Sequence, residues 1–424
     1  MAHPDFARAA AHVTADAVRS LLMDLVDIAS PTGRESGVAQ YLVARMQRSG
    51  MDTDLPLVEP GRPNAVGHRR GRGDGLNLLF TGHMDTSYSG DEPHLAGEGF
   101  RPKAIHRDGW VWGLGANNMK SGLASALVAI EAIAKTNIEL AGDISFGGVV
   151  GEIEKTAIEE FQGSEYSGYG IGTRHLATHG VTADFALLAE PTGMRIARAN
   201  MGVVWARVSI GGTVAHSALA NRPNVVNAIA VMHELQSDIA QWARDYEAAH
   251  VYMGERPNVT VAAIRGGAPW RLSRNPYDCS LYLDIRTVPG QTVEGVKRAL
   301  RAVLRGFAGR KGIAEPAMHV YVSDPPNLLD ENLPIIQALG AAQAAVTGEQ
   351  PPPIIRRPGA DAVHLSAYGV PCVCFGPGGR IHPDARAASS MHAFGEHVLV
   401  DDCVAAAKIY LALALDLCSR RPED

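Results

Sequence analysis

A histidine and an aspartate lie two residues apart directly after an apolar run. The run Leu78–Phe80 is typical of a buried strand, and Gly82 comes just before His83. In an open α/β sheet, ligands bind beyond the carboxyl ends of the strands. His83 could bind a metal ion there, and Asp85 could orient its ring by bonding to the other nitrogen. A His-x-Asp pair alone is more typical of a turn, so a metal site is indicated only if further ligands follow.

Further residues of metal-binding type follow in order along the chain. They are Asn118, before an Ala-rich helix expected at 121–135; Glu152, after a strand expected at 143–150; Glu190, after a strand expected at 185–188; and His392 near the end of the chain. Imidazole nitrogens and carboxylate oxygens are usual ligands of zinc-class ions. The sequence therefore predicts a metal-dependent site at the carboxyl edge of a sheet.

The elements that must position these residues follow an α/β pattern with an interruption. Apolar residues at helical spacing predict helices at 5–28, 333–347 and 400–418, among others. Short apolar runs predict strands at 64–70, 76–81 and 370–375. Between residues 201 and 324 the pattern is strand, helix, strand, strand, helix, strand, which is typical of helices packed on an antiparallel sheet. A chain of 424 residues is also too long for one ordinary core.

The composition excludes several classes of protein. Hydrophobic residues make up 46% and charged residues 20%, which is typical of a globular chain, and the net charge of −6 argues against nucleic-acid or anionic-membrane partners. No apolar run approaches the length of a membrane span. The five Cys residues have irregular spacing, and the N-terminus lacks the pattern of a signal peptide. We therefore expect a reduced, cytoplasmic protein.

The order of the motifs resembles the metallopeptidase and amidohydrolase family of aminoacylase, succinyl-diaminopimelate desuccinylase, acetylornithine deacetylase and carboxypeptidase G. The resemblance covers nearly the whole chain, and further segments carry it: Gly211-Gly212 with Val214–Ser217, Asp284–Gly290, Phe375–Gly378, and His392 with Glu396–Val398. It implies an α/β catalytic domain at 1–200 and 325–424, with a mixed, mostly parallel sheet between helices. It also implies an inserted α+β lid and dimerisation domain at 201–324, and a homo-oligomer that is at least a dimer.

The resemblance also assigns roles at the site. In that family two divalent ions share a bridging Asp, and a Glu acts as general base on the water. By motif, His83 and Glu190 would hold the first ion and His392 the second. Glu152 matches the general base, and Asp85 matches the residue that orients His83.

Two positions depart from the family pattern. The bridging Asp falls on Asn118, whose amide carries no charge, and the second ion's Glu falls on Ile153, which cannot bind an ion. We therefore expect one divalent transition metal ion of the manganese or zinc class, with the second site lost. A one-residue gap in the match would instead place Glu154 at the base or ligand position. The departures also leave open a catalytically inactive binding protein of the same fold.

Residues of the inserted domain and two loops are candidates for substrate binding. The resemblance implies that His216 reaches a neighbouring subunit's site and stabilises an oxyanion, although it could be a solvated loop residue. Arg286 matches an arginine that binds a substrate carboxylate, a task for which its planar guanidinium is suited; alternatively it forms a structural ion pair. Further candidates for an altered pocket are Arg271, within Trp270–Pro276, and Arg380, Trp110 and Trp112.

The expected reaction is hydrolysis of a C–N bond in a small substrate that carries a carboxylate. The Asn-Asn-Met-Lys-Ser segment at 117–121 also resembles an aminohydrolase branch that replaces an aromatic amine by hydroxyl. This branch implies 5-nitroanthranilate as substrate, with 5-nitrosalicylate and ammonia as products. The alternatives are a deacylase or desuccinylase of N-acyl amino acids, or a carboxypeptidase, in which the bond broken is an amide.

Overall fold

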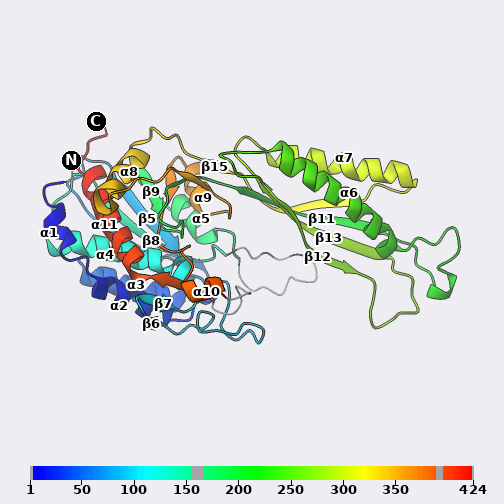
Figure 1. The fold of residues 1–424 in the computed structure, drawn as a ribbon, viewed down its shortest axis with the longest axis horizontal. Coiled ribbons are helices and arrows are strands. Elements are labelled where there is room, and N and C mark those ends of the chain that lie inside the picture. The colour runs from blue at the N-terminus through cyan, green and yellow to red at the C-terminus, as the bar shows by residue number, and fades with distance from the viewer. Residues whose placement is uncertain (1–2, 154–155, 157, 159–166, 388–394, 423–424) are drawn as a thin grey trace. The chain divides into compact units, whose positions relative to one another are not determined.

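A computed structural model describes residues 3–153, 156, 158, 167–387 and 395–422, and it divides the chain into two compact units (Figure 1). The first unit comprises Met1–Arg198, Leu329–Ile354 and Ala360–Asp424. The second comprises Ala199–Leu328 and Ile355–Gly359. The division of the chain into a catalytic domain and an inserted lid and dimerisation domain stays a prediction about what these units do.

A mixed sheet has the strand order β1-β4-β8-β5-β9-β17-β10-β15, and β16 also pairs with β10. Its strands from β1 to β17 in this order form the middle of the first unit. The strands are β1 (Asp52–Asp54), β4 (Ala65–Arg69), β5 (Leu78–His83), β8 (Ile144–Val149), β9 (Phe185–Leu188), β10 (Ala197–Asn200), β15 (Asn327–Leu328), β16 (Ile354–Arg356) and β17 (Cys372–Cys374). The central strands β8, β5, β9 and β17 are parallel, and β1, β4, β10 and β15 pair antiparallel at the margins. The four central strands therefore present their carboxyl ends at one edge.

Short strands complete the first unit. β2 (Leu57–Glu59) pairs with β3 (Arg62–Pro63), and β7 (Trp110–Trp112) lies between β6 (Ile105–Arg107) and β18 (His397–Leu399). An irregular turn at Ala116–Lys120 precedes the first long helix after β7.

Helices cover both faces of the central strands. The described helices of the first unit are α1 (Phe6–Ala10), α2 (Ala15–Val26), α3 (Ser36–Arg48), α4 (Ser121–Lys135), α5 (Ile171–Thr178), α8 (Pro334–Thr347), α9 (Ala362–Ala367), α10 (Pro383–Ala387) and α11 (Val400–Leu417). Two adjacent glycines of β8 show how closely the helices approach. A Cβ on Gly147 would meet Leu176 of α5, and one on Gly148 would meet Leu42 of α3. Because successive strand residues face opposite ways, α3 and α5 lie on opposite faces.

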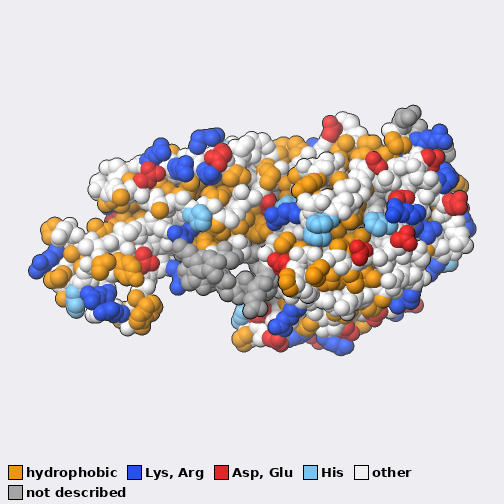
Figure 2. Space-filling model, turned by 180° about the vertical axis from the view of Figure 1, so that it is seen from behind, with side chains coloured by type: hydrophobic (Ala, Val, Ile, Leu, Met, Phe, Trp, Pro, Cys, Tyr) orange, Lys and Arg blue, Asp and Glu red, His pale blue; other side chains and the backbone are white. Residues whose placement is uncertain are grey.

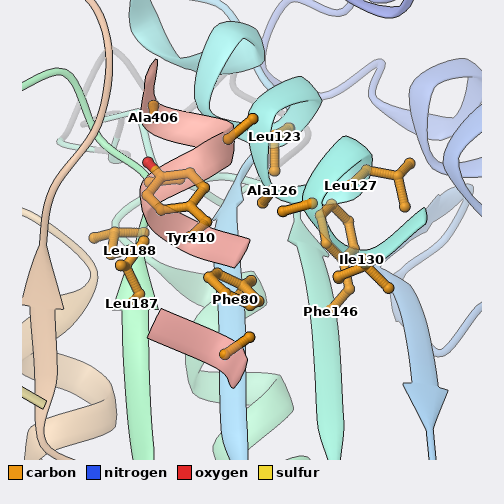
Figure 3. Packing of buried hydrophobic residues seen from close by; sticks show 14 of the residues in the cluster. Phe80, Leu123, Ala126, Leu127, Ile130, Phe146, Leu187, Leu188, Ala406 and Tyr410 are labelled. Atoms are coloured by element: carbon orange, nitrogen blue, oxygen red, sulfur yellow. The ribbon is translucent and has the colours of Figure 1, made fainter. Parts of the chain in front are cut away.

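The core of the first unit lies between β5, β8, α4 and α11. Phe80 and Phe146 point from the strands towards Leu123 and Ile130 of α4, with Tyr410 of α11 beside them (Figure 3). The rings of Phe80 and Tyr410 have centroids 5.6 Å apart. β5 is buried at every position, which explains why its sequence is a continuous apolar run rather than an alternating one.

The second unit is an antiparallel sheet covered on one face by two helices (Figure 1). The strand order is β12-β13-β11-β14, and the elements are β11 (Gly202–Gly211), α6 (Ala228–Ala249), β12 (Val259–Gly266), β13 (Asp278–Thr287), α7 (Val293–Lys311) and β14 (Ala317–Asp324). Met232 and Leu235 of α6 and Leu300 of α7 pack against inward residues of the strands. The edge strand β12, in contrast, is exposed at seven of its eight positions.

The predicted fold class, α/β with a mixed sheet between helices, is confirmed, although parallel pairing is confined to the central strands. The pattern expected between 201 and 324 is also the observed order of elements. The single helix expected at 5–28 is wrong, because it is divided into α1 and α2. Thr14 between them is extended (φ −106°, ψ 157°), and its hydroxyl accepts a hydrogen bond from the Ala17 amide, which starts a new helix.

Charged side chains of both signs are interspersed over the face shown in Figure 2, without a large area of one sign. This distribution agrees with the dispersed Lys and Arg residues of the sequence. Within the described ranges, none of the helices has the length and apolar character that crossing a membrane requires.

Candidate metal centre

His83 is the last residue of β5 and is completely buried. In the parallel pairing of β5 with β8, His83 lies opposite Val149, so Glu152 follows only three residues beyond it. In the pairing of β5 with β9, Thr81 lies opposite Leu188, and Glu190 follows two residues later. The register of the sheet thus brings both carboxylates to the imidazole.

The three side chains form a compact group. His83 Nε2 lies 3.7 Å from Glu152 Oε2 and 3.8 Å from Glu190 Oε1, and the three ligand atoms lie within 4.8 Å of one another. His83 Nδ1 lies 2.9 Å from the main-chain oxygen of Asp85, which can only accept a hydrogen bond, so Nδ1 carries the proton. Nε2 points at two carboxylate oxygens, which together favour a positive charge beside them. A divalent cation could take the place of a proton there and bind the nitrogen and both oxygens, so the donor set fits a zinc-class ion.

The negative charge around His83 also favours a cation. Burial alone would lower the pKa of His83, but the charge of Glu152, the hydrogen bond to Asp85 and the charge of Glu190 together raise it well above its ordinary value. A group of charges that stabilises an imidazolium in this way also stabilises a bound divalent ion.

Glu152 has the environment of an acid–base group. Burial raises its pKa well above the ordinary value, and the charge of Glu190 adds to this effect, whereas the charge of His83 opposes it. A carboxyl group with a raised pKa can accept a proton and return it during a reaction near neutral pH. Two residues later in the chain, Glu154 lies outside the described residues.

The carboxylate of Asp85 contacts more than the imidazole. Its Oδ1 lies 3.5 Å from His83 Nδ1 but also accepts the amide of Glu152 at 3.2 Å. Its Oδ2 accepts the amide of Ile153 at 3.1 Å and the hydroxyl of Thr32 at 2.9 Å. The predicted hydrogen bond that orients His83 is therefore supplied mainly by the main-chain carbonyl of Asp85, while its side chain holds the segment that carries Glu152.

Asn118 reaches the same group from the turn before α4. Its Oδ1 lies 3.4 Å from His83 Nε2, and its amide donates to Glu396 Oε2 at 2.9 Å. The neighbouring amide of Asn117 donates to the same oxygen at 3.2 Å. Glu396, which belongs to a segment that carries the family resemblance but had no predicted role, thus fixes the turn, and Asn118 can offer a neutral carbonyl oxygen to an ion.

A further carboxylate near the site was not predicted. Asp361 is buried, and its Oδ2 accepts the hydroxyl of Thr173 at 2.5 Å. Burial raises the pKa of Asp361 to about 7, and the negative charges of Asp85 and Glu190 contribute to the rise. The hydrogen bond from Thr173 and the charge of His83 oppose it. The Gly-Ala-Asp-Ala sequence around it resembles a helix start, and nothing local in it indicates a buried acid.

The other predicted residues have varied surroundings. Arg380 Nε lies 3.0 Å from Asp402 Oδ2, and the rings of Trp110 and Trp112 both contact those of His382 and His397. His392 lies outside the described residues. Metal coordination by His392 is therefore a prediction that the structure leaves untested.

The predicted residues of the second unit lie in two settings. Arg286 Nη2 lies 2.7 Å from Asp284 Oδ2, so it takes part in an ion pair within its own strand. His216 and Arg271 are exposed on neighbouring loops. His216 Nδ1 accepts the amide of Ala218 at 3.1 Å, so Nε2 carries the proton and can donate it to a partner.

Comparisons with known proteins identify the family of the chain. The family model of peptidase family M20/M25/M40 matches residues 79–416. The chain is 25% identical to N-formyl-4-amino-5-aminomethyl-2-methylpyrimidine deformylase of Bacillus subtilis, covering 93% of this chain and 92% of the relative. It is 28% identical to succinyl-diaminopimelate desuccinylase of Gluconacetobacter diazotrophicus, covering 93% and 95% of the two chains.

Solved structures share the fold. A tripeptidase from Staphylococcus aureus superposes with a TM-score of 0.74 at 19% identity, covering 96% of this chain and 99% of that one. Human carnosine dipeptidase 1 superposes with a TM-score of 0.69 at 15% identity, covering 99% and 100% of the two chains. The family match, spanning most of the chain, decides its membership: the chain belongs to peptidase family M20/M25/M40 and is a metal-dependent hydrolase that acts on C–N bonds.

Proposed function

We propose that this chain is a hydrolase with a single divalent metal ion, held by His83, Glu190 and the carbonyl of Asn118, and with Glu152 as general base. The observation that carries the proposal is the compact group of His83, Glu152 and Glu190 beside an amide rather than a carboxylate. The charge that would hold a second ion is missing at Asn118 and at Ile153. His392 could complete the ligand set.

The chemistry follows from these residues. A bound ion of the manganese or zinc class would supply Lewis acidity and lower the pKa of a coordinated water towards neutrality. Glu152 takes the proton of the attacking water and returns it to the leaving nitrogen, a role that its raised pKa supports. Asp85 holds the amides of Glu152 and Ile153 during these transfers.

We further propose 5-nitroanthranilate as the substrate. Water adds to the ring carbon that bears the amine, and the para nitro group takes up the negative charge. Glu152 passes the water proton to the amine, the C–N bond breaks, and ammonia leaves with 5-nitrosalicylate as the second product. The ortho amine and carboxylate of this substrate could complete a metal ligand set that lacks a bridging carboxylate, which gives a reason for the amide at Asn118.

The second candidate is hydrolysis of an amide, as in an N-acyl-amino-acid deacylase, a desuccinylase or a carboxypeptidase. Its support is the names of the relatives, a deformylase and a desuccinylase, which align over nearly the whole chain. In this case the attacked carbon is a carbonyl carbon, and an oxyanion forms. Arg286, Arg271 and Arg380 are proposed to recognise the substrate carboxylate in either reaction.

We also propose that the protein works in the cytoplasm as a homo-oligomer, at least a dimer, through its second unit. Within the described residues, β12 pairs with β13 on one side only, and it exposes Val261 and Ile264. Such an apolar edge strand is open to pairing with another chain. A dimer would let His216 of one copy donate Nε2–H to an oxyanion in the other. The five cysteines are buried and none is joined to another by a disulfide bond, which supports a reducing compartment.

The test is product analysis with metal-stripped protein, to which manganese or zinc is added back. Incubation with 5-nitroanthranilate should give metal-dependent ammonia and loss of the amine's absorbance. A panel of N-formyl, N-acetyl and N-succinyl amino acids and dipeptides should be assayed in parallel for the released acid or amine. Release of an acid without ammonia would contradict the aminohydrolase proposal and support amide hydrolysis instead. Absence of any turnover, with metal bound, would support the binding-protein alternative.

A further inference from the structure

Glu152 lies in a stretch of chain that hydrogen-bonds to a second stretch further along the sequence. We call residues 150–153 and 167–173 the Glu152 stem. The amide of Gly170 donates to the carbonyl of Gly151 at 2.9 Å, and the amide of Gly172 donates to the carbonyl of Val150 at 3.1 Å. These bonds fix the path of the chain as it leaves β8 and therefore the position of Glu152.

A buried amide strengthens the Glu152 stem. Asn64 is fully buried, and its Oδ1 accepts the amide of Val150 at 3.0 Å. Its Nδ2 donates to the carbonyl of Gly172 at 2.9 Å. One side chain thus bonds to both stretches of the stem and ties them to the start of β4.

A buried arginine contacts the stem from the other side. Arg62 Nη1 donates to the carbonyl of Ser167 at 2.8 Å, and the amide of Ser167 donates to Glu59 at 3.1 Å. Gly151 has φ +65°, and a Cβ there would lie 2.9 Å from Arg62 Nη2 and 2.8 Å from the Ser167 oxygen. Arg62 therefore packs directly against the residue before Glu152.

Arg62 is held in place by two carboxylates. Its Nε and Nη2 donate to the two oxygens of Glu35 at 3.0 and 2.6 Å, and its Nη1 also contacts Glu59. Arg62 and Glu35 are only 3% and 0% exposed. Burying such a pair costs desolvation energy that a pair of apolar residues would avoid, so stability alone does not account for it. What the pair does provide is a fixed geometry, because a bidentate contact leaves the guanidinium little freedom.

We propose that Arg62 is a positioning residue for the general base: it holds the Glu152 stem so that the Glu152 carboxylate faces His83. The proposal rests on the proposed function, in which Glu152 moves the proton. It separates two tasks at the site. The metal ligands His83 and Glu190 are placed by β5 and β9, whereas the base is placed by Asp85, Asn64 and Arg62.

The test compares R62K with R45K. Lysine at 62 keeps the charge but cannot reproduce the bidentate contact with Glu35 together with the bond to Ser167. Arg45 is a matched control, because its Nε and Nη2 contact Glu131 at 2.6 and 3.1 Å in a half-buried pair that joins α3 to α4 rather than the Glu152 stem. We expect R62K to lower kcat about tenfold or more, as small misplacements of catalytic groups do, while R45K leaves it within about twofold.

Two readouts distinguish positioning from general damage. In R62K the KM and the metal Kd, measured by chelator competition, should stay within about twofold of wild type, since β5 and β9, rather than the Glu152 stem, place the metal ligands. Amide exchange measured by mass spectrometry should be faster in the peptide covering 144–153 in R62K but not in R45K. A parallel loss of metal affinity, or an unchanged kcat in folded R62K, overturns the proposal.

The outcomes also separate this proposal from the proposed function. If the wild-type protein turns over none of the substrates, the proposed function fails, and the exchange measurement alone decides whether Arg62 holds the stem; unchanged exchange in R62K overturns that role. If R62K does not fold, E59Q replaces it. Glu59 is 21% exposed, and its substitution leaves the Arg62–Glu35 pair while weakening the contact to Ser167, so a smaller loss of kcat, about threefold, is expected.

Discussion

The two units of the chain differ in the burial of their candidate functional side chains. In the first unit, His83 and Glu190 are fully buried and face each other across the ends of parallel strands. In the second unit, His216 and Arg271 are exposed, and the neighbouring Trp270 is 85% exposed. A buried group can act only on what enters its own site, whereas an exposed group on a loop is accessible to a partner from outside its own unit.

The exposed loops of the second unit are nevertheless firmly anchored. Asn275 is buried, and its Nδ2 donates to the carbonyls of Thr213 and Val226, both at 2.8 Å. The amide of Ser217 donates to the carbonyl of Ser273 at 2.9 Å, which joins the two loops. Their tips are therefore presented from a fixed base, as a binding surface requires, rather than left to move independently.

The largest expected effect concerns the buried site of the first unit. E152Q keeps the shape of the side chain but removes the base, so kcat should fall by about 10³-fold or more. The metal content should remain one ion per chain, because His83 and Glu190 are unchanged. Steady-state kinetics and elemental analysis on the same sample check both points. Retention of a tenth of the activity would instead make Glu154 the candidate base.

A second prediction tests whether the exposed side needs another copy of the chain. H216N removes a donor for the oxyanion, so kcat should fall about 10²-fold. If His216 acts across a dimer, mixing and refolding E152Q with H216N should raise the activity well above that of either variant, since a mixed dimer contains one intact site. Activity of the mixture equal to the mean of the two variants would show that His216 acts within its own chain or not at all.

A third prediction concerns the amide at the metal group. N118D places a charged oxygen where Asn118 Oδ1 lies, 3.4 Å from His83 Nε2. The added charge should tighten binding of the single ion by about tenfold. Because Ile153 still offers no ligand, the stoichiometry should stay at one ion per chain. Chelator competition measures the affinity, and a second tightly bound ion would contradict the single-metal assignment.

The smallest expected effect concerns the pH dependence of stability. The pKa of Asp361 is raised from 3.8 to about 7, so between these values the native protein holds a proton that the unfolded chain has lost. The free energy of unfolding of the metal-free protein should therefore decline as the pH rises through this window, and D361N should lessen the decline. Urea midpoints at pH 5 and pH 8 measure it, with exposed Asp16→Asn as the control. An equal decline in wild type and D361N would contradict the raised pKa.

The metal group itself could be predicted because its signals are local. His83, Glu152 and Glu190 each follow an apolar run with strand character, and parallel strands bring such positions to one edge. Asp361, Glu396 and Arg62 could not be found in this way. Each lies in a loop or a short strand whose sequence gives no sign of burial, and each becomes functional only through contacts with segments distant along the chain.

The sequence by itself determined the buried central strands, the order of the ligand-type residues that follow them and the neutral side chains at Asn118 and Ile153, because apolar periodicity and residue type are properties of short segments. The tertiary structure alone decided what each carboxylate does. Asp85 bonds to the amides of Glu152 and Ile153, and Asp361 holds a raised pKa. These outcomes depend on burial and on partners far away in the chain, which set the energy of a charge but leave no mark on the sequence around it.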